Sequence, residues 1–305
     1  MDRLKEFRPT LKIFTSSLLA LLMIFFFIYN YQSLVRIFSQ VNVGWLFTGF
    51  MAYVMNYGFR GSRLRIMIGT KKIQYHDALS YVITHGVLSY LLPLRSGDAS
   101  LPVILKTYKV TNLKRGFAIL LKTRVLDISM LGFFSLCGSY IGARMISNSV
   151  NLIWIFAAIG LTSLFFLFRY IIKIRFLIPE RFISVVTDFS HFFSIERYEF
   201  FLTFMIWLSL SLSQLCMVRA IGLNLSLPEI LFISTIQFPL QLLPIQGFAN
   251  SGNHEGGWMA ALTLMGFASK DAINFALASH CVLILYVLGL GTIGTLFAIK
   301  PLKLC

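Results

Sequence analysis

The fold is decided by residues 77–108, DALSYVITHGVLSYLLPLRSGDASLPVILKTY. An apolar stretch runs to Leu92, stops at the polar run from Pro93 to Asp98, and resumes for a few residues as far as Lys106. The first arm has about 16 residues, or roughly 24 Å of helix, which is shorter than the ~30 Å hydrocarbon core of a bilayer. Irregular backbone is tolerated at that depth only where protein or a wet cavity satisfies its polar groups. The pattern therefore predicts a re-entrant helical hairpin whose tip lies inside the membrane.

A second segment, residues 228–267, shows the same pattern. Its apolar stretch runs to Leu243, stops at the residues PIQG that begin with Pro244, and is followed by a short apolar stretch that ends near Gly266. We interpret it as a second re-entrant hairpin. Each break is introduced by Leu-Leu-Pro, and the two copies lie 151 residues apart, about half the chain. This spacing suggests the inverted repeat found in many transporters, although Leu-Leu-Pro also arises by chance in a Leu-rich chain.

The composition is that of a membrane protein. Of the 305 residues, 57% are hydrophobic and 13% are charged, and the mean hydropathy is +0.77. Soluble domains carry about 25% charged residues, so a water-soluble fold could not cover this apolar surface. Besides the two hairpins, six segments approach the ~20 residues that a membrane span needs. The sequence thus predicts an all-α polytopic integral membrane protein, a single domain over residues 1–305, with spans at roughly 13–29, 43–59, 117–139, 150–168, 200–221 and 273–298.

Positive charge sets the predicted orientation. The net charge is +15, and the basic residues lie in short runs between apolar segments, which favours anionic membrane lipids over nucleic acid as partners. With the N-terminus in the cytoplasm and each hairpin returning to its starting face, twenty of the 27 Lys and Arg fall on the cytoplasmic side, among them Arg60, Arg63 and Arg65. This topology predicts a multi-pass protein of the cell membrane with both termini cytoplasmic. It also predicts a basic interfacial connector at 169–199 and hairpins that enter from opposite faces.

Charged residues inside a membrane are costly, and each needs a partner or a role. Arg124 and Asp127 lie three residues apart near the middle of the third span, on one helix face, so we expect them to pair. Such a pair either locks helix packing or forms the polar wall of a substrate path. Lys122 lies nearer the cytoplasmic end of the same span, where its long side chain could extend to the interface.

The hairpin tips hold the remaining candidates. Arg95 and Asp98 flank the first tip, where a cation next to the start of a helix suits a phosphate. A bridge between these two residues would instead merely close the turn. The second tip carries a polar cluster with Gln246, His254 and Glu255, which either binds a headgroup or satisfies the broken backbone. The candidate substrate-binding residues are therefore Arg95, Asp98, Lys122, Arg124, Asp127, Gln246, His254 and Glu255.

The sequence contains no complete motif for catalysis or for metal binding. His254-Glu255 resembles the start of the zinc-protease motif H-E-x-x-H, but Trp258 stands where the second histidine belongs. The chain has no Walker motif and no G-x-S-x-G. We therefore expect no catalytic site, no metal and no cofactor.

The two hairpin segments resemble the transmembrane domain of lysylphosphatidylglycerol synthases, a family that also includes stand-alone flippase-like membrane proteins. One stretch runs from Pro93 to Asp98 and is followed after about 25 residues by TRVLD, which ends at Asp127. The family typically has Pro, then Gly-Glu, then a Glu-Arg-x-x-Asp helix. The other stretch runs from Pro244 to Glu255. Here the family shows Pro, a Gly-rich turn and Gly-x-x-Glu.

The resemblance has departures. Asp98 stands where Glu is usual, Leu101 where an Arg is common, and Thr123 in place of the first Glu of the helix motif. The resemblance implies two opposed re-entrant hairpins and a role in moving or handling lipids between leaflets. Its matched polar positions are Asp98, Arg124, Asp127 and Glu255.

The leading hypothesis is a flippase-like lipid translocase for a polar lipid with an anionic, phosphate or glycosylated headgroup. Transport would run down a gradient or be coupled to an ion or a proton. Two alternatives remain open at this point: an integral-membrane enzyme that acts on a lipid headgroup, and a structural or regulatory membrane subunit. The sequence leaves the oligomeric state open as well.

Overall fold

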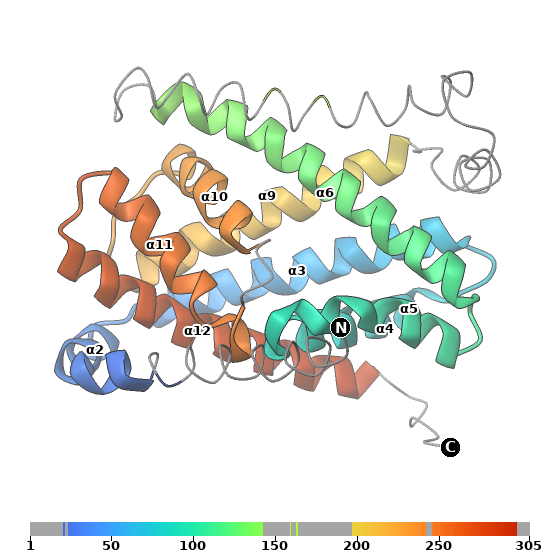
Figure 1. Cartoon of the computed structure of the whole chain (residues 1–305), viewed down its shortest axis with the longest axis horizontal. Helices are drawn as coiled ribbons and strands as arrows, with labels where there is room; N and C mark the ends of the chain where they lie inside the picture. The colour runs from blue at the N-terminus through green and yellow to red at the C-terminus, as the bar shows by residue number, and fades with distance from the viewer. Residues whose placement is uncertain are drawn as a thin grey trace, which may run out of the picture.

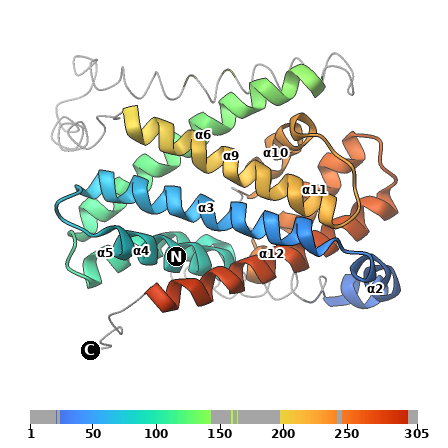
Figure 2. The same cartoon turned by 180° about the vertical axis from the view of Figure 1, so that it is seen from behind.

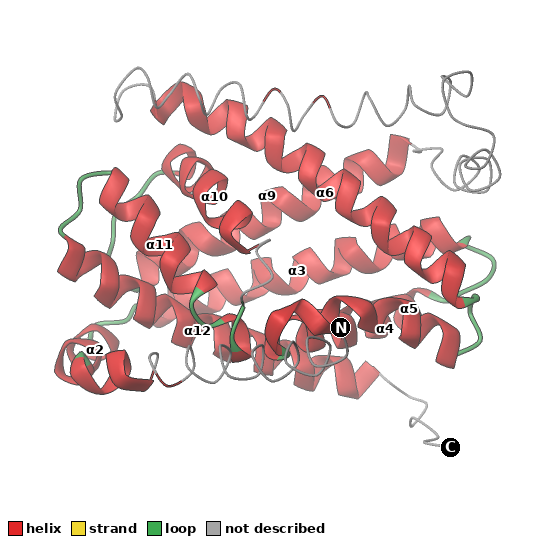
Figure 3. Ribbon diagram, viewed as in Figure 1, coloured by secondary structure: helices red, strands yellow, loops and turns green. Residues whose placement is uncertain are grey.

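The computed structural model describes residues 24–142, 197–241 and 246–297, with the isolated positions 21, 159 and 163. Every regular element within these ranges is helical, as Figure 3 shows. In chain order the elements are α2 (Tyr31–Ser39), α3 (Val43–Ile68), α4 (Tyr75–Leu91), the 3-10 turn η1 (Pro93–Ala99), α5 (Ser100–Thr107), α6 (Leu113–Gly142), α9 (Arg197–Ala220), α10 (Leu227–Gln241), the 3-10 turn η3 (Phe248–Asn250), α11 (Asn253–Leu264) and α12 (Ser269–Phe297).

Four long helices, α3, α6, α9 and α12, run along the long axis of the bundle (Figure 1). α3 and α9 lie side by side over most of their length (Figure 2). Of the described helices, α9 and α12 are long and apolar enough to cross a membrane. α3 and α6 are as long, but both carry Lys or Arg within the helix. These internal charges mark the two helices that line the polar interior described below.

The first hairpin consists of α4, η1 and α5, and its break follows from the sequence. α4 ends just before Pro93, because a residue that precedes proline is pushed out of the helical conformation. Leu94 and Arg95 then adopt left-handed backbone, with φ of 58° and 55°. Gly97 packs so closely on α4 that a Cβ there would lie 2.2 Å from the carbonyl oxygen of Leu88. The tip therefore requires glycine at this position.

The second hairpin consists of α10, η3 and α11. Its tip repeats the backbone feature of the first, since two successive non-glycine residues, Ala249 and Asn250, adopt left-handed backbone with φ of 51° and 62°. Gly252 follows with φ of 86°, and α11 begins directly after it. The carboxylate of Glu255 accepts a hydrogen bond from the Gly252 amide at 2.7 Å and so closes the start of α11.

The two hairpins extend from opposite ends of the bundle and meet at their tips (Figure 1). The Leu94 amide donates to the carbonyl oxygen of Gln246 at 2.7 Å. The Gln246 side chain donates in turn to the carbonyls of Ser89 and Tyr90, at 3.2 and 3.3 Å. Segments more than 150 residues apart in sequence are thus joined at the centre of the molecule.

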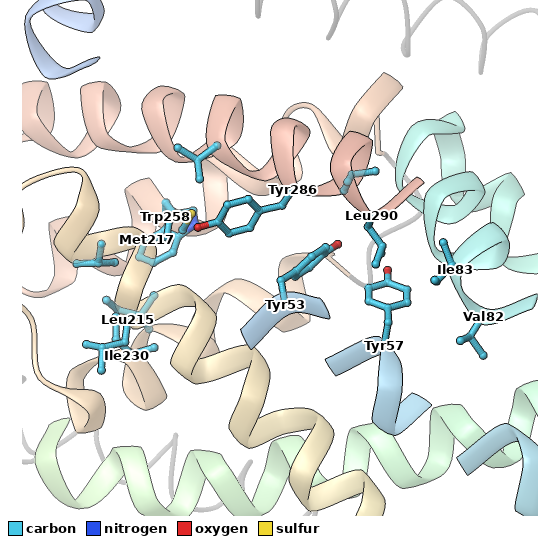
Figure 4. Close-up of a cluster of buried hydrophobic side chains, with 14 of the residues drawn as sticks. Tyr53, Tyr57, Val82, Ile83, Leu215, Met217, Ile230, Trp258, Tyr286 and Leu290 are labelled. Atoms are coloured by element: carbon cyan, nitrogen blue, oxygen red, sulfur yellow. The ribbon is translucent and has the colours of Figure 1, made fainter. Parts of the chain in front are cut away.

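An aromatic cluster fills the interior between α3, α11 and α12, as Figure 4 shows. Tyr53 lies between Tyr57 and Tyr286, with ring centroids 5.4 and 5.8 Å away. The Tyr286 hydroxyl donates to the carbonyl of Leu46 at 2.6 Å, which ties α12 to α3. Trp258 of α11 is fully buried in the same cluster. These contacts hold the second hairpin firmly against the long helices.

The predicted spans 117–139, 200–221 and 273–298 correspond to α6, α9 and α12. α3 does not stop at residue 59, where the second predicted span ends, but continues to Ile68. Arg60, Arg63 and Arg65 therefore belong to the same helix as that span. Arg63 is 3% exposed, and the buried carboxylate that it meets explains why it needs no water.

Several predicted features lie outside the described residues. These are most of the span 13–29, the span 150–168 apart from two isolated positions, the connector 169–199 apart from its last three residues, and the Leu-Leu-Pro break at 242–244.

Candidate functional site

A cavity of about 260 Å³ lies where α3, α4, α6 and the tip of the first hairpin converge. Its wall carries four arginines and two aspartates, an excess of two positive charges. Tyr57, Tyr90 and Trp207 are among the aromatic side chains that complete the wall. We call it the charged cavity, and its charged residues are Arg60, Arg63, Arg95, Arg124, Asp98 and Asp127.

Asp98 bridges two of these arginines. Its Oδ1 accepts from Nη2 of Arg124 on α6 at 2.7 Å, and its Oδ2 lies 3.2 Å from Nη2 of Arg95. The bridge from Arg95 that closes the turn is therefore present, but the same carboxylate also ties the tip to α6. The three side chains are 21–30% exposed, so this end of the cavity is open.

The predicted pairing of Arg124 with Asp127 is wrong. Oδ1 of Asp127 is 2.7 Å from Nη1 of Arg63 on α3, and the side chains of this pair are 14% and 4% exposed. The same Arg63 nitrogen donates to the Thr203 hydroxyl of α9 at 2.9 Å. The short Asp127 side chain meets the helix that faces it, whereas the longer Arg124 side chain reaches the hairpin tip. This deep end of the cavity is a buried ion pair that joins three helices.

Arg60 is the cavity cation that differs from the others. Its Nε donates to the side-chain oxygen of Asn56 at 2.8 Å, and its guanidinium lies 5.6 Å from the centre of the Tyr57 ring. Within the described residues, Arg60 forms no ion pair with a carboxylate. Arg60 therefore supplies one of the two excess positive charges, and the other lies at Arg95 and Arg124, which share the single carboxylate of Asp98.

Two polar side chains hold the tips beside the cavity. His85 of α4 lies with Nδ1 2.8 Å from the hydroxyl of Ser100, which joins the two arms of the first hairpin. Gln246, a predicted candidate, lines the cavity while its amide binds the backbone of α4. Both residues fix the position of the tips around the charged groups.

A second cavity of about 180 Å³ adjoins the first and shares Tyr53, Arg60, Tyr90 and Asn250 with it. Apart from Arg60, its wall carries no arginine, lysine, aspartate or glutamate. His254, another predicted candidate, lines this second cavity. Two of the three predicted candidates from the second tip thus line different cavities, since Gln246 lines the charged cavity and His254 the second one.

Glu255 lines neither cavity. Its Oε1 contacts Nδ1 of His280 on α12, and the two side chains are 9% and 2% exposed. The expectation that Arg95, Asp98, Arg124 and Glu255 share one cavity therefore fails at Glu255, because α12 supplies a histidine partner that sequence spacing does not reveal.

Lys122 does not extend to the interface as predicted. Its Nζ lies 2.7 Å from Oε1 of Glu199 on α9, and the two side chains are 8% and 2% exposed. Lys122 is not among the described residues that line the charged cavity. In residues 24–142, 197–241 and 246–297, no cluster of three or more His, Cys, Asp or Glu could hold a metal ion.

Comparison with known proteins matches this architecture to one family. The model of the family described as "Lysylphosphatidylglycerol synthase TM region" matches residues 13–291. The chain belongs to this family. No curated protein and no solved structure matches the chain. Membership of this family confirms the resemblance drawn from the tip motifs and makes the chain a helical membrane protein of a lipid-related family.

Three of the four polar positions matched to the lysylphosphatidylglycerol synthase family meet in the charged cavity, namely Asp98, Arg124 and Asp127. The fourth, Glu255, lies at the second tip against α12. The departure from the family pattern at Asp98 keeps a carboxylate at the tip, and that carboxylate reaches two arginines.

Sequence reasoning missed Arg60, Arg63, His85 and His280. Asn56, Arg60 and Arg63 follow one another at helical spacings of four and three, which places them on one face of α3. That periodicity was the signal that the helix continues past residue 59. No comparable signal marks His280, a single histidine within an apolar span.

Proposed function

We propose that the protein moves a lipid with an anionic headgroup between the leaflets of the cell membrane. The observation that carries the proposal is the excess of two positive charges in the cavity at the meeting point of the two hairpin tips. Charges inside a membrane protein are retained where they serve a substrate or ion path. A negatively charged headgroup would neutralise this excess, while its acyl or prenyl tails remained in the surrounding lipid.

These arginines are suited to binding a phosphate group in the lipid headgroup. Guanidinium groups bind phosphate oxygens through two parallel hydrogen bonds, as they bind carboxylates. Asp98 occupies Arg95 and Arg124 in this structure, so a phosphate that enters from the open end would compete with it for both groups. Arg60 has no carboxylate to displace and would make the first full contact.

We further propose transport rather than bond chemistry at this site. Both cavity carboxylates are bound to arginines, Asp98 to Arg95 and Arg124, and Asp127 to Arg63, so neither is free to act on a substrate bond. An enzyme for a lipid headgroup would need a group free to act as acid or base. The two cavity carboxylates therefore give no support to the enzymatic alternative.

The membrane placement belongs to the same proposal. The hairpins extend from opposite ends of the bundle, and both tips use two successive left-handed residues, which supports two opposed re-entrant hairpins related by an inverted repeat. With both termini cytoplasmic, cysteines introduced at positions 35 and 147 should react with an impermeant maleimide from outside the cell. Reaction of a cysteine at position 175 from outside would contradict this topology.

The function is tested with the purified full chain in vesicles that contain fluorescent phosphatidylglycerol. Lipid in the outer leaflet is bleached by dithionite, and loss of the protected inner pool measures flipping. We expect faster flipping of phosphatidylglycerol than of zwitterionic phosphatidylcholine, and a lipid that mass spectrometry shows to be chemically unchanged. A chain that flips neither lipid, or that modifies the headgroup, would overturn the proposal.

Arg60→Gln supplies the sharpest variant for this assay. It removes one of the two uncompensated charges without leaving a buried carboxylate behind, so folding should be preserved. Loss of one hydrogen bond to a charged group is worth about 1.5–3 kcal/mol, which corresponds to a roughly 10- to 150-fold slower rate. Arg36→Gln, at an exposed arginine of α2, is the matched control and should flip like the wild type. Equal rates for the two variants would exclude Arg60 from the substrate path.

A further inference from the structure

The contact between Glu255 and His280 fixes the tip of the second hairpin from two sides. Oε1 of Glu255 meets Nδ1 of His280, while Oε2 accepts the Gly252 amide at 2.7 Å. The other imidazole nitrogen, Nε2, lies 2.7 Å from the carbonyl oxygen of Ala249. The tip of the hairpin is thus bound to α12 through this acid–histidine pair.

The geometry determines how many protons the pair holds. A carbonyl oxygen only accepts hydrogen bonds, so Nε2 of His280 must carry a proton to bind Ala249. Nδ1 faces a carboxyl oxygen, and two lone pairs would repel each other, so a second proton must lie between them. Whether it sits on the imidazole or on the carboxyl group, the pair holds one proton more than a neutral histidine beside a carboxylate.

None of the other carboxylates inside the described part of the bundle has such a partner. Asp98 and Asp127 are paired with arginines, which stay charged at any ordinary pH, and Glu199 is paired with Lys122. Glu255 alone among these four acids faces a histidine, the residue type that gains and loses a proton near neutral pH. Of the four carboxylates, it is the one that can take part in binding and releasing a proton without breaking a permanent ion pair.

The surroundings of the pair carry no cation to replace that proton. The titratable groups that face it are His254 from α11, with ring centroids 5.0 Å apart, Tyr90 from α4, at 6.3 Å, and Cys281 from α12 itself. No Lys or Arg in the described part of the chain forms an ion pair with Glu255. His254 and Tyr90 also line the second cavity, so the pair lies one side chain away from an open space.

We propose that Glu255 and His280 form a proton-binding site that couples lipid movement to proton movement, an inference that rests on the proposed function. While the proton is bound, the pair holds the tip against α12. Release of the proton to water leaves two lone pairs face to face, so the contact opens and the tip loses its anchor. The tip also binds the first hairpin through Gln246, which carries the change to the charged cavity.

The variant Glu255→Gln tests the coupling to proton movement without disturbing the fold. The glutamine amide can donate to Nδ1 of His280, and its oxygen can accept from Gly252, so the variant keeps both contacts but cannot release a proton. Glu229→Gln is the matched control, because Glu229 accepts a backbone amide near the start of α10 as Glu255 does near the start of α11. Its contacts within the described residues are with Ser226 and not with a histidine. Both variants should fold.

The transport test uses vesicles with fluorescent phosphatidylglycerol and an imposed pH difference, with and without a protonophore. We expect the flipping rate of the wild type and of Glu229→Gln to change several-fold with the gradient and to lose this response with the protonophore. Glu255→Gln should flip at a rate that the gradient does not alter. A gradient response retained by Glu255→Gln, or absent from a wild type that flips lipid, would overturn the coupling.

A second measurement decides the proton site without any transport. In the full chain labelled with ¹⁵N-histidine, the His280 signals are identified by their loss in His280→Asn. We expect them to change with pH in the wild type and to stay fixed in Glu255→Gln. His280 signals that do not change with pH in the wild type would refute the site, even if lipid flipping were observed. A wild type that titrates but flips no lipid would instead refute the proposed function, and the coupling with it, while the proton-binding site would stand.

Discussion

Asp127→Asn is expected to destabilise the bundle by about 3–5 kcal/mol, because it leaves the Arg63 guanidinium buried without its carboxylate. The two groups are 2.7 Å apart, and their side chains are 4% and 14% exposed, so water screens the lost attraction only weakly. The remaining hydrogen bond from Arg63 to Thr203 does not compensate, since a hydroxyl carries no charge. The cost should appear in the free energy of unfolding, measured by denaturant titration in mixed micelles.

A double-mutant cycle separates this pair from the one that sequence spacing suggests. Arg63→Met combined with Asp127→Asn should cost less than the sum of the single changes, with a coupling of about 1–3 kcal/mol. The same cycle between Arg124 and Asp127 should give no more than about 0.5 kcal/mol, because Arg124 binds Asp98 instead. A larger coupling in the second cycle than in the first would refute the ion pairing described here.

Three further changes test the packing around the site. Lys122→Met removes the cation 2.7 Å from buried Glu199 and should cost about 3–5 kcal/mol in unfolding free energy, much of which Glu199→Gln in the same chain should restore. Gly97→Ala forces a Cβ to 2.2 Å from backbone and should lower folded yield and stability by about 1–3 kcal/mol or more, whereas Gly256→Ala, with open space around it, should be tolerated. Gln246→Leu loses the side-chain hydrogen bonds to two α4 carbonyls and should lower the unfolding free energy by about 1–2 kcal/mol. Backbone hydrogen exchange at the two tips should become faster. Unchanged exchange would show that the Gln246 side chain does not hold the tips in place.

Much of the fold could be predicted because its decisive signals are local. Proline removes a backbone donor and bars the preceding residue from helix, so the break at Pro93 is visible in sequence. The apolar runs of α9 and α12 can be recognised as possible membrane spans from their length alone. Tip positions such as Asp98 and Gln246 stand out because polar residues interrupt apolar arms. These features depend on neighbours in the chain and on no distant contact.

The ion pairs could not be predicted in the same way, because each joins helices that are far apart in sequence. Arg124 and Asp127 share a helix face, but each finds a better partner on another element. Arg63 looked like a cytoplasmic residue because a basic side chain at the end of an apolar run usually reaches water. His280 gave no signal at all, since its role depends entirely on Glu255. Local spacing shows which side chains can meet, whereas tertiary packing decides which do.

The contact between the hairpin tips has a consequence for how the molecule tolerates mutation. The bond from the Leu94 amide to the Gln246 carbonyl joins two main-chain atoms, so almost any residue at either position can still form it. This main-chain contact between the tips is therefore largely insensitive to substitution of the side chains. The ion pairs beside it lack this protection, because Asp98 and Asp127 each depend on an arginine side chain. Substitutions that leave the tip backbone intact should therefore keep the two hairpins joined, whereas substitutions at the ion pairs weaken the packing of the helices around them.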